Sequence, residues 1–122
     1  MCGLAGILTQ TSSSNCEDSL RKMGQSLVHR GPDDEGIWMD PTAGIGLAHQ
    51  RLSVIDLSSE GRQPMLAASG RYVIAYNGEV YNFLELRKKL DHAGGSQWRG
   101  HSDTEVILAA IEKWGLSQAL TE

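Results

Sequence analysis

The sequence contains no apolar run that approaches the roughly 18 residues needed by a membrane-spanning helix. It also lacks a secretory signal peptide, because the first residues offer no basic start, no long apolar core and no cleavage site. Cysteine is scarce, and Cys2 and Cys16 form neither a metal-type pair nor a disulfide framework. These absences predict a protein without membrane association, in a reducing compartment, with the cytoplasm as the default. Without a signal peptide to be cleaved, Cys2 is expected to stay in the mature chain.

Other binding features are missing as well. The formal net charge is -4 and no cluster of basic residues occurs, which argues against nucleic acid as a partner. The Gly94-Gly95 pair lacks the Lys and Ser/Thr of a phosphate-binding loop. No metal-ligand spacing relates the histidines, which are His29, His49, His92 and His101. We therefore predict no metal site, interpret each histidine as a structural or surface residue, and favour a small polar ligand.

The first half of the chain predicts one strand, one helix and a hairpin. A short buried strand is expected over residues 4–8, then a polar loop over 9–15 and a helix over about 17–29, where apolar residues recur at helical spacing. Extended stretches near 36–39 and 44–51, separated by the turn signal at Asp40 and Pro41, form the hairpin. With 122 residues and an ordinary apolar fraction of 40%, the chain is long enough for one domain.

The second half contains the clearest strand pattern. Residues 71–76 are β-branched and aromatic and end at the turn pair Asn77-Gly78, whereas residues 53–64 have no regular pattern. A helix is expected after Asn82 as N-cap, ending at Gly94-Gly95.

A further helix is expected after Ser102. Ser102 and Glu105 have the spacing of a capping box, and Gly115 suits the C-cap. The chain stops soon after a new apolar pattern begins, which is typical of a cut made inside a domain.

Cys2 is the first candidate for chemistry. A cysteine nucleophile acts as its thiolate and needs a base, which is often a histidine. If Met1 is removed, the α-amine of Cys2 itself can take the thiol proton, and this transfer is nearly balanced at neutral pH. The alternative interpretation is a small buried cysteine in a first strand, because free cysteine is among the most buried residue types.

Three further positions could complete such a site. Acyl transfer needs donors for an oxyanion, and Asn77 with Gly78 offers a side-chain amide beside an unobstructed main-chain N–H. An amino-acid substrate needs a cation and an anion, and Arg51 at a strand end and Asp103 in a first helical turn can supply them. Taken singly, an Asn-Gly pair more often forms a plain hairpin turn, and each of the two charges is more often a solvated or helix-end residue.

Six stretches together resemble a known family. They are MCGLAGI, HRGPDDEG, HQRLSVIDLS, GRQP, YNGEVYN and HSDTEVIL. In this order and at these separations they resemble the glutaminase domain of class II glutamine amidotransferases, which are N-terminal nucleophile hydrolases, and within that family they most resemble glutamine-hydrolysing asparagine synthetase. The resemblance extends from residue 1 to about residue 114. It implies an α+β fold, an αββα sandwich with antiparallel sheets, which these residues would leave incomplete at the C-terminus.

The resemblance also implies roles for individual residues. Freed of Met1, Cys2 would attack the glutamine side-chain amide with its own α-amine as base, and Asn77 and Gly78 would form the oxyanion hole. Arg51 would hold the substrate α-carboxylate. The α-ammonium would be held by Glu79 and Asp103, and the pocket would be lined around Leu52, Val54 and Ile55. The residues Arg30, Gly31 and Pro32 would shape the loop over the site.

The implied function is hydrolysis of L-glutamine to glutamate and ammonia through a Cys2 thioester. Ammonia would pass to a synthetase domain or subunit for transfer to an acceptor such as activated aspartate, although a sugar acid is also open. No cofactor is expected in this domain, because ATP and Mg²⁺ would belong to the synthetase domain. The αββα strands that these residues lack would leave unpaired sheet edges, which predicts a homo-oligomer and a chain that is marginally stable alone.

The sequence allows two other functions. One is a catalytically silent glutamine-binding or interaction fragment, which would bind glutamine without turnover and would tolerate loss of Cys2. The other is a papain-like cysteine hydrolase, which is disfavoured because no histidine stands in a context that marks it as the base.

Overall fold

The computed structural model describes residues 1–9, 15–94 and 97–122. Most of the loop expected over residues 9–15, and Gly95 of the expected helix stop, therefore lie outside the described residues. The chain forms two compact units: Met1–Ser53, Arg62–Pro64 and Ala75–Asn77 make the first, and Val54–Gly61, Met65–Ile74 and Gly78–Glu122 the second. Both units combine helices or turns with antiparallel strands, which confirms the α+β class.

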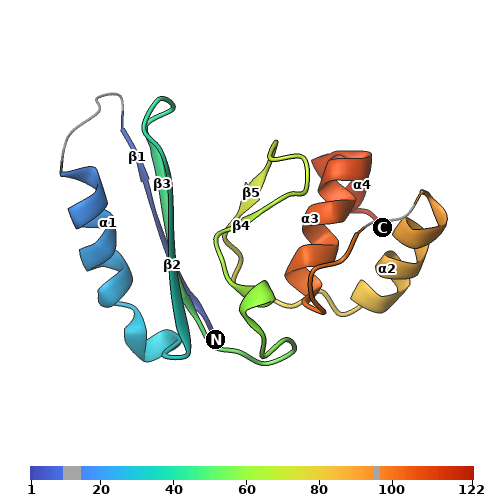
Figure 1. Cartoon of the computed structure of the whole chain (residues 1–122), viewed down its shortest axis with the longest axis horizontal. Helices are drawn as coiled ribbons and strands as arrows, with labels where there is room; N and C mark the ends of the chain where they lie inside the picture. The colour runs from blue at the N-terminus through green and yellow to red at the C-terminus, as the bar shows by residue number, and fades with distance from the viewer. Residues whose placement is uncertain (10–14, 95–96) are drawn as a thin grey trace. The chain divides into compact units, whose positions relative to one another are not determined.

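The first unit contains a three-stranded antiparallel sheet (Figure 1). Its strands are β1 (Gly3–Leu8), β2 (Asp34–Asp40) and β3 (Ile45–Arg51), in the order β1-β3-β2. The opening strand and the hairpin are thus confirmed. At the hairpin turn the Asp40 carboxylate accepts the main-chain N–H groups of Thr42 and Ala43, which closes the turn locally.

One face of this sheet is covered by α1 (Cys16–Gln25) (Figure 1). Leu20 is fully buried there, and Gly46 of β3 leaves room for it, because a Cβ on Gly46 would lie 3.0 Å from Leu20 Cδ2. The helix ends at Gln25, earlier than the expected 29, and a 3₁₀ turn, η1 (Val28–Arg30), follows. The early end has a local cause, since glycine and serine at 24 and 26 are weak helix formers.

The second unit contains the two-stranded pairing of β4 (Met65–Leu66) with β5 (Val73–Ile74). The strand expected over residues 71–76 is wrong in extent, because only Val73 and Ile74 have a partner strand. The residues between these strands and Ser53 are irregular as expected, apart from the short 3₁₀ turn η2 (Ser59–Gly61). A strand needs a ladder partner as well as a suitable sequence, and β4 provides one for two residues only.

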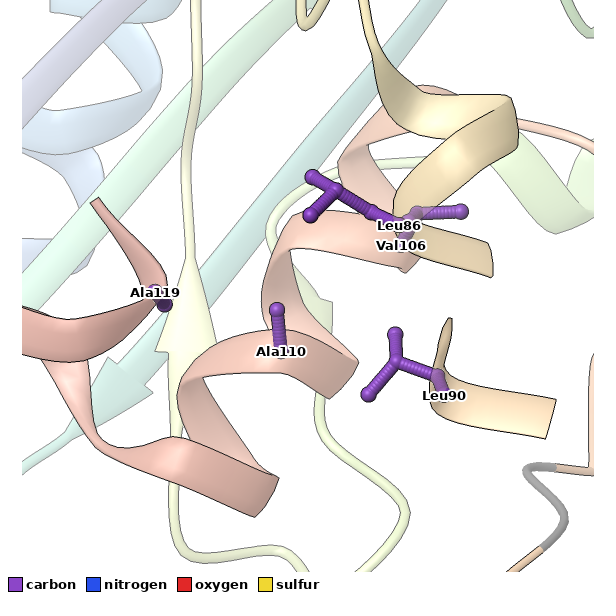
Figure 2. Packing of buried hydrophobic residues seen from close by; sticks show 5 residues of the cluster. All are labelled: Leu86, Leu90, Val106, Ala110 and Ala119. Carbon is purple, nitrogen blue, oxygen red and sulfur yellow. The ribbon is translucent and has the colours of Figure 1, made fainter. Parts of the chain in front are cut away.

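Helices make up the rest of the second unit: α2 (Phe83–His92), α3 (Asp103–Trp114) and α4 (Leu116–Ala119). The expected helices α2 and α3 are confirmed, and α4 is an addition. Figure 2 shows the apolar cluster that joins them, which consists of Leu86, Leu90, Val106, Ala110 and Ala119. Each member is no more than 6% exposed, so this cluster forms the core of the unit.

The N-terminus of α3 confirms half of the expected capping box. Ser102 Oγ accepts the N–H of Glu105 at 3.1 Å, as an N-cap should. The Glu105 carboxylate accepts instead from the N–H groups of Arg99 and Gly100, at 2.8 and 3.0 Å. Gly115 has a positive φ of 82° at the other end of α3, which agrees with its predicted place as C-cap.

The predicted cap of α2 is wrong in its mechanism. Asn82 precedes the first residue of α2, but its side chain accepts no capping hydrogen bond from the helix. Asn82 occupies the predicted N-cap position, but its amide donates to the main-chain carbonyl of Glu122, at 3.1 Å.

Candidate active site

Cys2 lies immediately before β1, at the end of the sheet where β3 finishes. The antiparallel register pairs Gly3 with Gln50, so the chain around Cys2 runs beside the residues that follow Gln50. The main-chain N–H of Leu52 donates to Cys2 Sγ at 3.3 Å, and the thiol donates to the Leu52 carbonyl at 3.7 Å. Cys2 is half-buried. Its sulfur therefore has a defined position, with a main-chain donor already directed at it.

Arg51 is the last residue of β3, beside that same position. Its side chain is 7% exposed, and its strand partner in β2 is Asp34. The loop after η1 packs against its main chain, because a Cβ on Gly31 would lie only 2.5 Å from the Arg51 carbonyl carbon and the Gln50 oxygen. The backbone of Asp33 also donates to the Arg51 carbonyl at 3.0 Å. This close approach explains why glycine is needed in the His-Arg-Gly-Pro-Asp stretch, whose expected role in shaping a loop over the site stays a prediction.

Asp34 and Arg62 form an ion pair at this end of the unit. Arg62 donates to both carboxylate oxygens of Asp34, at 3.0 and 2.9 Å. The hydrogen bond from Arg62 holds the pKa of Asp34 below its ordinary value, and the nearby charge of Arg51 acts in the same direction. Asp34 is therefore ionised at neutral pH.

His49 belongs to the same strand as Arg51 and is 1% exposed. Burial lowers the pKa of His49, and the charge of Arg51 lowers it further, whereas the hydrogen bond to Tyr76 and the charge of Asp34 oppose the shift. The imidazole Nε2 lies 3.1 Å from the main-chain carbonyl oxygen of Tyr76. His49 is thus a neutral, buried donor and not a surface residue, which settles one of the two alternatives left open for it.

Asn77 also belongs to the first unit, as the last residue of the Ala75–Asn77 segment. Its side chain is exposed, and the residue before it, Tyr76, is held to the unit through His49 and through Gln63, whose Oε1 accepts the Tyr76 N–H at 2.6 Å. The first unit therefore carries four of the predicted site residues, which are Cys2, Arg51, Leu52 and Asn77.

The second unit carries the other predicted residues, which are Val54, Ile55, Gly78, Glu79 and Asp103. Asp103 is 7% exposed, and its carboxylate accepts the N–H groups of Val80 and Thr104, at 2.9 and 2.8 Å. The bond to Val80 brings the segment that contains the exposed Glu79 to the N-terminus of α3.

Asp56 ties a second segment to the same helix end. It is 6% exposed and accepts the N–H of His101 at 2.8 Å, so the loop that contains Val54 and Ile55 is linked to the start of α3. Within the second unit, the predicted acids and the predicted pocket-lining residues therefore come from segments that meet at one helix terminus.

Sequence reasoning missed three residues that order these segments: His49, Gln63 and Asp56. All three lie within the quoted stretches HQRLSVIDLS and GRQP, and all three are buried. The available signal was a polar side chain inside an otherwise buried pattern, since a buried polar group needs a partner.

Two absences apply to the described residues alone. Within residues 1–9, 15–94 and 97–122, no group of three or more His, Cys, Asp or Glu side chains is placed to hold a metal ion. Among the helices of that same part of the chain, none is long and apolar enough to cross a membrane.

The sequence of the chain matches a known protein family. Residues 1–122 match the family described as glutamine amidotransferase domain. The chain belongs to this family. The resemblance inferred from the six stretches is thereby confirmed.

Individual relatives agree with this assignment. Asparagine synthetase [glutamine-hydrolyzing] 1 of Bacillus subtilis (strain 168) is 40% identical over 117 residues, which is 93% of this chain and 18% of that protein. Putative asparagine synthetase [glutamine-hydrolyzing] 2 of Methanocaldococcus jannaschii is 37% identical over 131 residues, covering 94% of this chain and 24% of that protein. Amidase chry2 of Gibberella zeae is 33% identical over 127 residues, covering 96% of this chain and 19% of that protein. The chain therefore spans less than a quarter of the length of each of these relatives.

Proposed function

We propose that this amidotransferase domain hydrolyses L-glutamine to glutamate and ammonia, with Cys2 as the nucleophile of an N-terminal nucleophile hydrolase of αββα architecture. The observation that carries the proposal is the placement of Cys2 Sγ, 3.3 Å from the Leu52 N–H and directly beside the end of β3 at Arg51. A thiol and a guanidinium therefore occur at one end of one sheet, which supports their proposed use as the nucleophile and as the cation that binds an amino-acid carboxylate. Membership of the glutamine amidotransferase family supports glutamine as the substrate.

The first chemical step forms a thioester. With Met1 removed, the α-amine of Cys2 takes the proton from Sγ as the sulfur bonds to the amide carbon of glutamine. The negative charge that develops on the amide oxygen is stabilised by Asn77 Nδ2 and the Gly78 N–H. When this intermediate collapses, the carbon–nitrogen bond breaks, the proton passes from the α-amine to the leaving nitrogen, and ammonia departs.

Water completes the cycle. It attacks the γ-glutamyl thioester, loses a proton to the α-amine and releases glutamate, while the sulfur regains its proton. During both steps Arg51 binds the α-carboxylate of the substrate, and Glu79 and Asp103 bind its α-ammonium group. The remaining contacts are to the apolar pocket lining of Leu52, Val54 and Ile55.

The ammonia acceptor lies outside this domain. We propose that ammonia passes to a synthetase domain or subunit that activates aspartate with ATP and Mg²⁺, in the cytoplasm, and that no cofactor is needed for the glutaminase step. The bacterial relative is named a glutamine-hydrolysing asparagine synthetase and the archaeal relative a putative one, and these names support this acceptor.

The experiment combines intact mass with glutamate release. The full chain is treated with 6-diazo-5-oxo-norleucine, a glutamine analogue that alkylates a nucleophilic cysteine, and the adduct is located by peptide mapping. We expect loss of Met1 and one adduct on Cys2, and we expect Cys2→Ala to abolish glutamate release. The matched control is Cys16→Ala, because Cys16 is a similarly half-buried thiol on α1 with no role in the proposed chemistry.

Two outcomes would contradict the proposal. Glutamate release by Cys2→Ala at the wild-type rate would exclude Cys2 as the nucleophile. Glutamine binding without an adduct and without turnover would favour the catalytically silent module.

A further inference from the structure

The main chain of Tyr76 is held on both sides by buried side chains. Its carbonyl oxygen lies 3.1 Å from His49 Nε2, and its N–H donates to Gln63 Oε1 at 2.6 Å. His49 is 1% exposed and Gln63 is 6% exposed. All three residues belong to the first unit, so these contacts lie within one body. We call this pair of contacts the Tyr76 clamp.

The clamp acts where regular pairing has stopped. β5 ends at Ile74, and two residues later the N–H and the carbonyl of Tyr76 meet side chains in place of a ladder partner. Gly36 makes room for this arrangement. It is the β2 partner of His49, and a Cβ there would collide with the main-chain carbonyl of Gln63.

The hydrogen-bond partner assigns the proton on His49. A carbonyl oxygen can only accept, so Nε2 carries the hydrogen and Nδ1 is unprotonated. Nδ1 is buried and has no hydrogen-bond partner among the residues that the structure describes. Protonation would therefore bury a second, unsatisfied donor together with a charge, which keeps the imidazole in the neutral form that the clamp uses.

The residue that follows the clamp is Asn77. We propose that His49 and Gln63 are positioning residues for the oxyanion hole: they act through the main chain of Tyr76 and hold the Asn77 amide and the Gly78 N–H where the oxyanion forms. This inference rests on the proposed glutaminase function. Oxyanion donors must be placed within about 0.5 Å, and an error of about 1 Å can lower a rate on the order of a hundredfold.

An apolar side chain at position 49 could fill the same buried space but could not donate a hydrogen bond to Tyr76. His49 lies on the sheet face that also carries Ile45 and Leu47 of the same strand, because side chains of a strand alternate between faces. A buried imidazole needs its hydrogen bond to offset the cost of burial, whereas leucine would not. Unlike leucine, the imidazole can donate a directional hydrogen bond. This bond fixes the Tyr76 carbonyl in the segment that leads to Asn77.

The test compares variants of the full chain that remove or restore the clamp. His49→Leu removes the donor, and His49→Gln returns an N–H donor at a similar reach. Gln63→Met removes the acceptor on the other side and replaces His49→Leu if that variant does not fold. Leu47→Ala is the matched control, because Leu47 precedes His49 by two residues in β3 and therefore lies on the same face of the sheet.

Three experiments distinguish a positioning role of His49 from a general loss of structure. The first measures kcat and KM for glutamine. The second measures the rate of Cys2 alkylation by iodoacetamide, which needs no oxyanion hole, and the third records the amide ¹H–¹⁵N shifts of Asn77 and Gly78. We expect His49→Leu to lower kcat by roughly ten- to a hundredfold with KM within about threefold, to leave alkylation unchanged and to move both amide signals. His49→Gln should recover part of kcat, and Leu47→Ala should keep it.

The outcomes of the two proposals can be told apart. If wild-type protein releases no glutamate, the proposed function fails, while movement of the Asn77 and Gly78 signals in His49→Leu still reports the clamp. If wild-type protein is an active, Cys2-dependent glutaminase and His49→Leu keeps its kcat and its amide shifts, the positioning role is wrong. Equal loss of kcat in Leu47→Ala would also overturn it.

Discussion

Nε2 of His49 lies 3.1 Å from the carbonyl oxygen of Tyr76, although 27 residues separate them in the chain. This contact joins the middle of β3 to the segment before Asn77 and gives a buried imidazole a defined protonation state. The burial of this imidazole, which lowers its pKa, makes the stability of the first unit sensitive to pH.

Stability should fall as the pH drops below about 6.5. Burial lowers the pKa of folded His49, so below the ordinary histidine value the unfolded chain binds a proton that the folded chain does not, and acidification favours unfolding. The charged groups that act on the imidazole are Arg51, which strengthens the shift, and Asp34, which weakens it. Urea unfolding at pH 7.5 and pH 5.5 should show a larger loss for wild type than for His49→Gln. Equal losses would mean that His49 is protonated in the folded protein.

Gly36→Ala should destabilise the first unit by about 1 to 3 kcal/mol, because the new methyl group would collide with the Gln63 carbonyl and force the backbone apart. Gly6→Ala is the control in the same sheet. A Cβ there would lie 3.5 Å from Leu47 Cδ2, which is an ordinary contact, so the free energy of unfolding should stay equal or rise slightly. Chemical denaturation of both variants tests the pair, and a tolerated Gly36→Ala would show that the Gln63 segment can move away from β2.

Ser102→Ala should lower the free energy of unfolding by about 1 kcal/mol, since Ser102 Oγ caps α3 by accepting the Glu105 N–H. Asn82→Ala, at the corresponding position before α2, should cost less than about 0.5 kcal/mol, because Asn82 makes no capping bond and its contact to Glu122 is exposed. Thermal denaturation followed by circular dichroism compares them. A reversed order of the two losses would contradict the capping assignment.

Leu86→Ala should be among the most damaging substitutions in the second unit, with an expected loss of about 2 to 5 kcal/mol. Leu86 is 3% exposed within the cluster that joins α2 to α3 (Figure 2). Leu84 on the same helix is 61% exposed, so Leu84→Ala should change the free energy of unfolding by no more than about 0.5 kcal/mol. Calorimetry of the two variants measures the difference, and similar losses would place the α2 core on another face.

Local patterns predicted most of the regular structure. The hairpin of β2 and β3 followed from two extended stretches around a turn, and α3 followed from its apolar stripe, with Ser102 and Gly115 at its two ends. Where prediction failed, the deciding partner was distant. The strand expected through Tyr76 stops at Ile74, because the groups that bind Tyr76 are side chains from other segments.

The candidate site divides in the same way. Cys2 and Arg51 could be named from the sequence because their side chains carry the chemistry. His49, Gln63 and Asp56 could not, because their importance depends on which main-chain groups they meet, such as the His101 N–H that Asp56 accepts.

By itself, the amino-acid sequence determined the α+β class, the glutamine amidotransferase family and the identity of the candidate nucleophile, because periodicity, turn residues and six ordered stretches are local properties of the chain. Only the tertiary structure decided that the strand beginning at Val73 ends at Ile74, that Leu52 directs its N–H at Cys2, and that His49 is a neutral donor to Tyr76. The physical reason is that a buried polar group must find a partner, and folding alone brings that partner within reach.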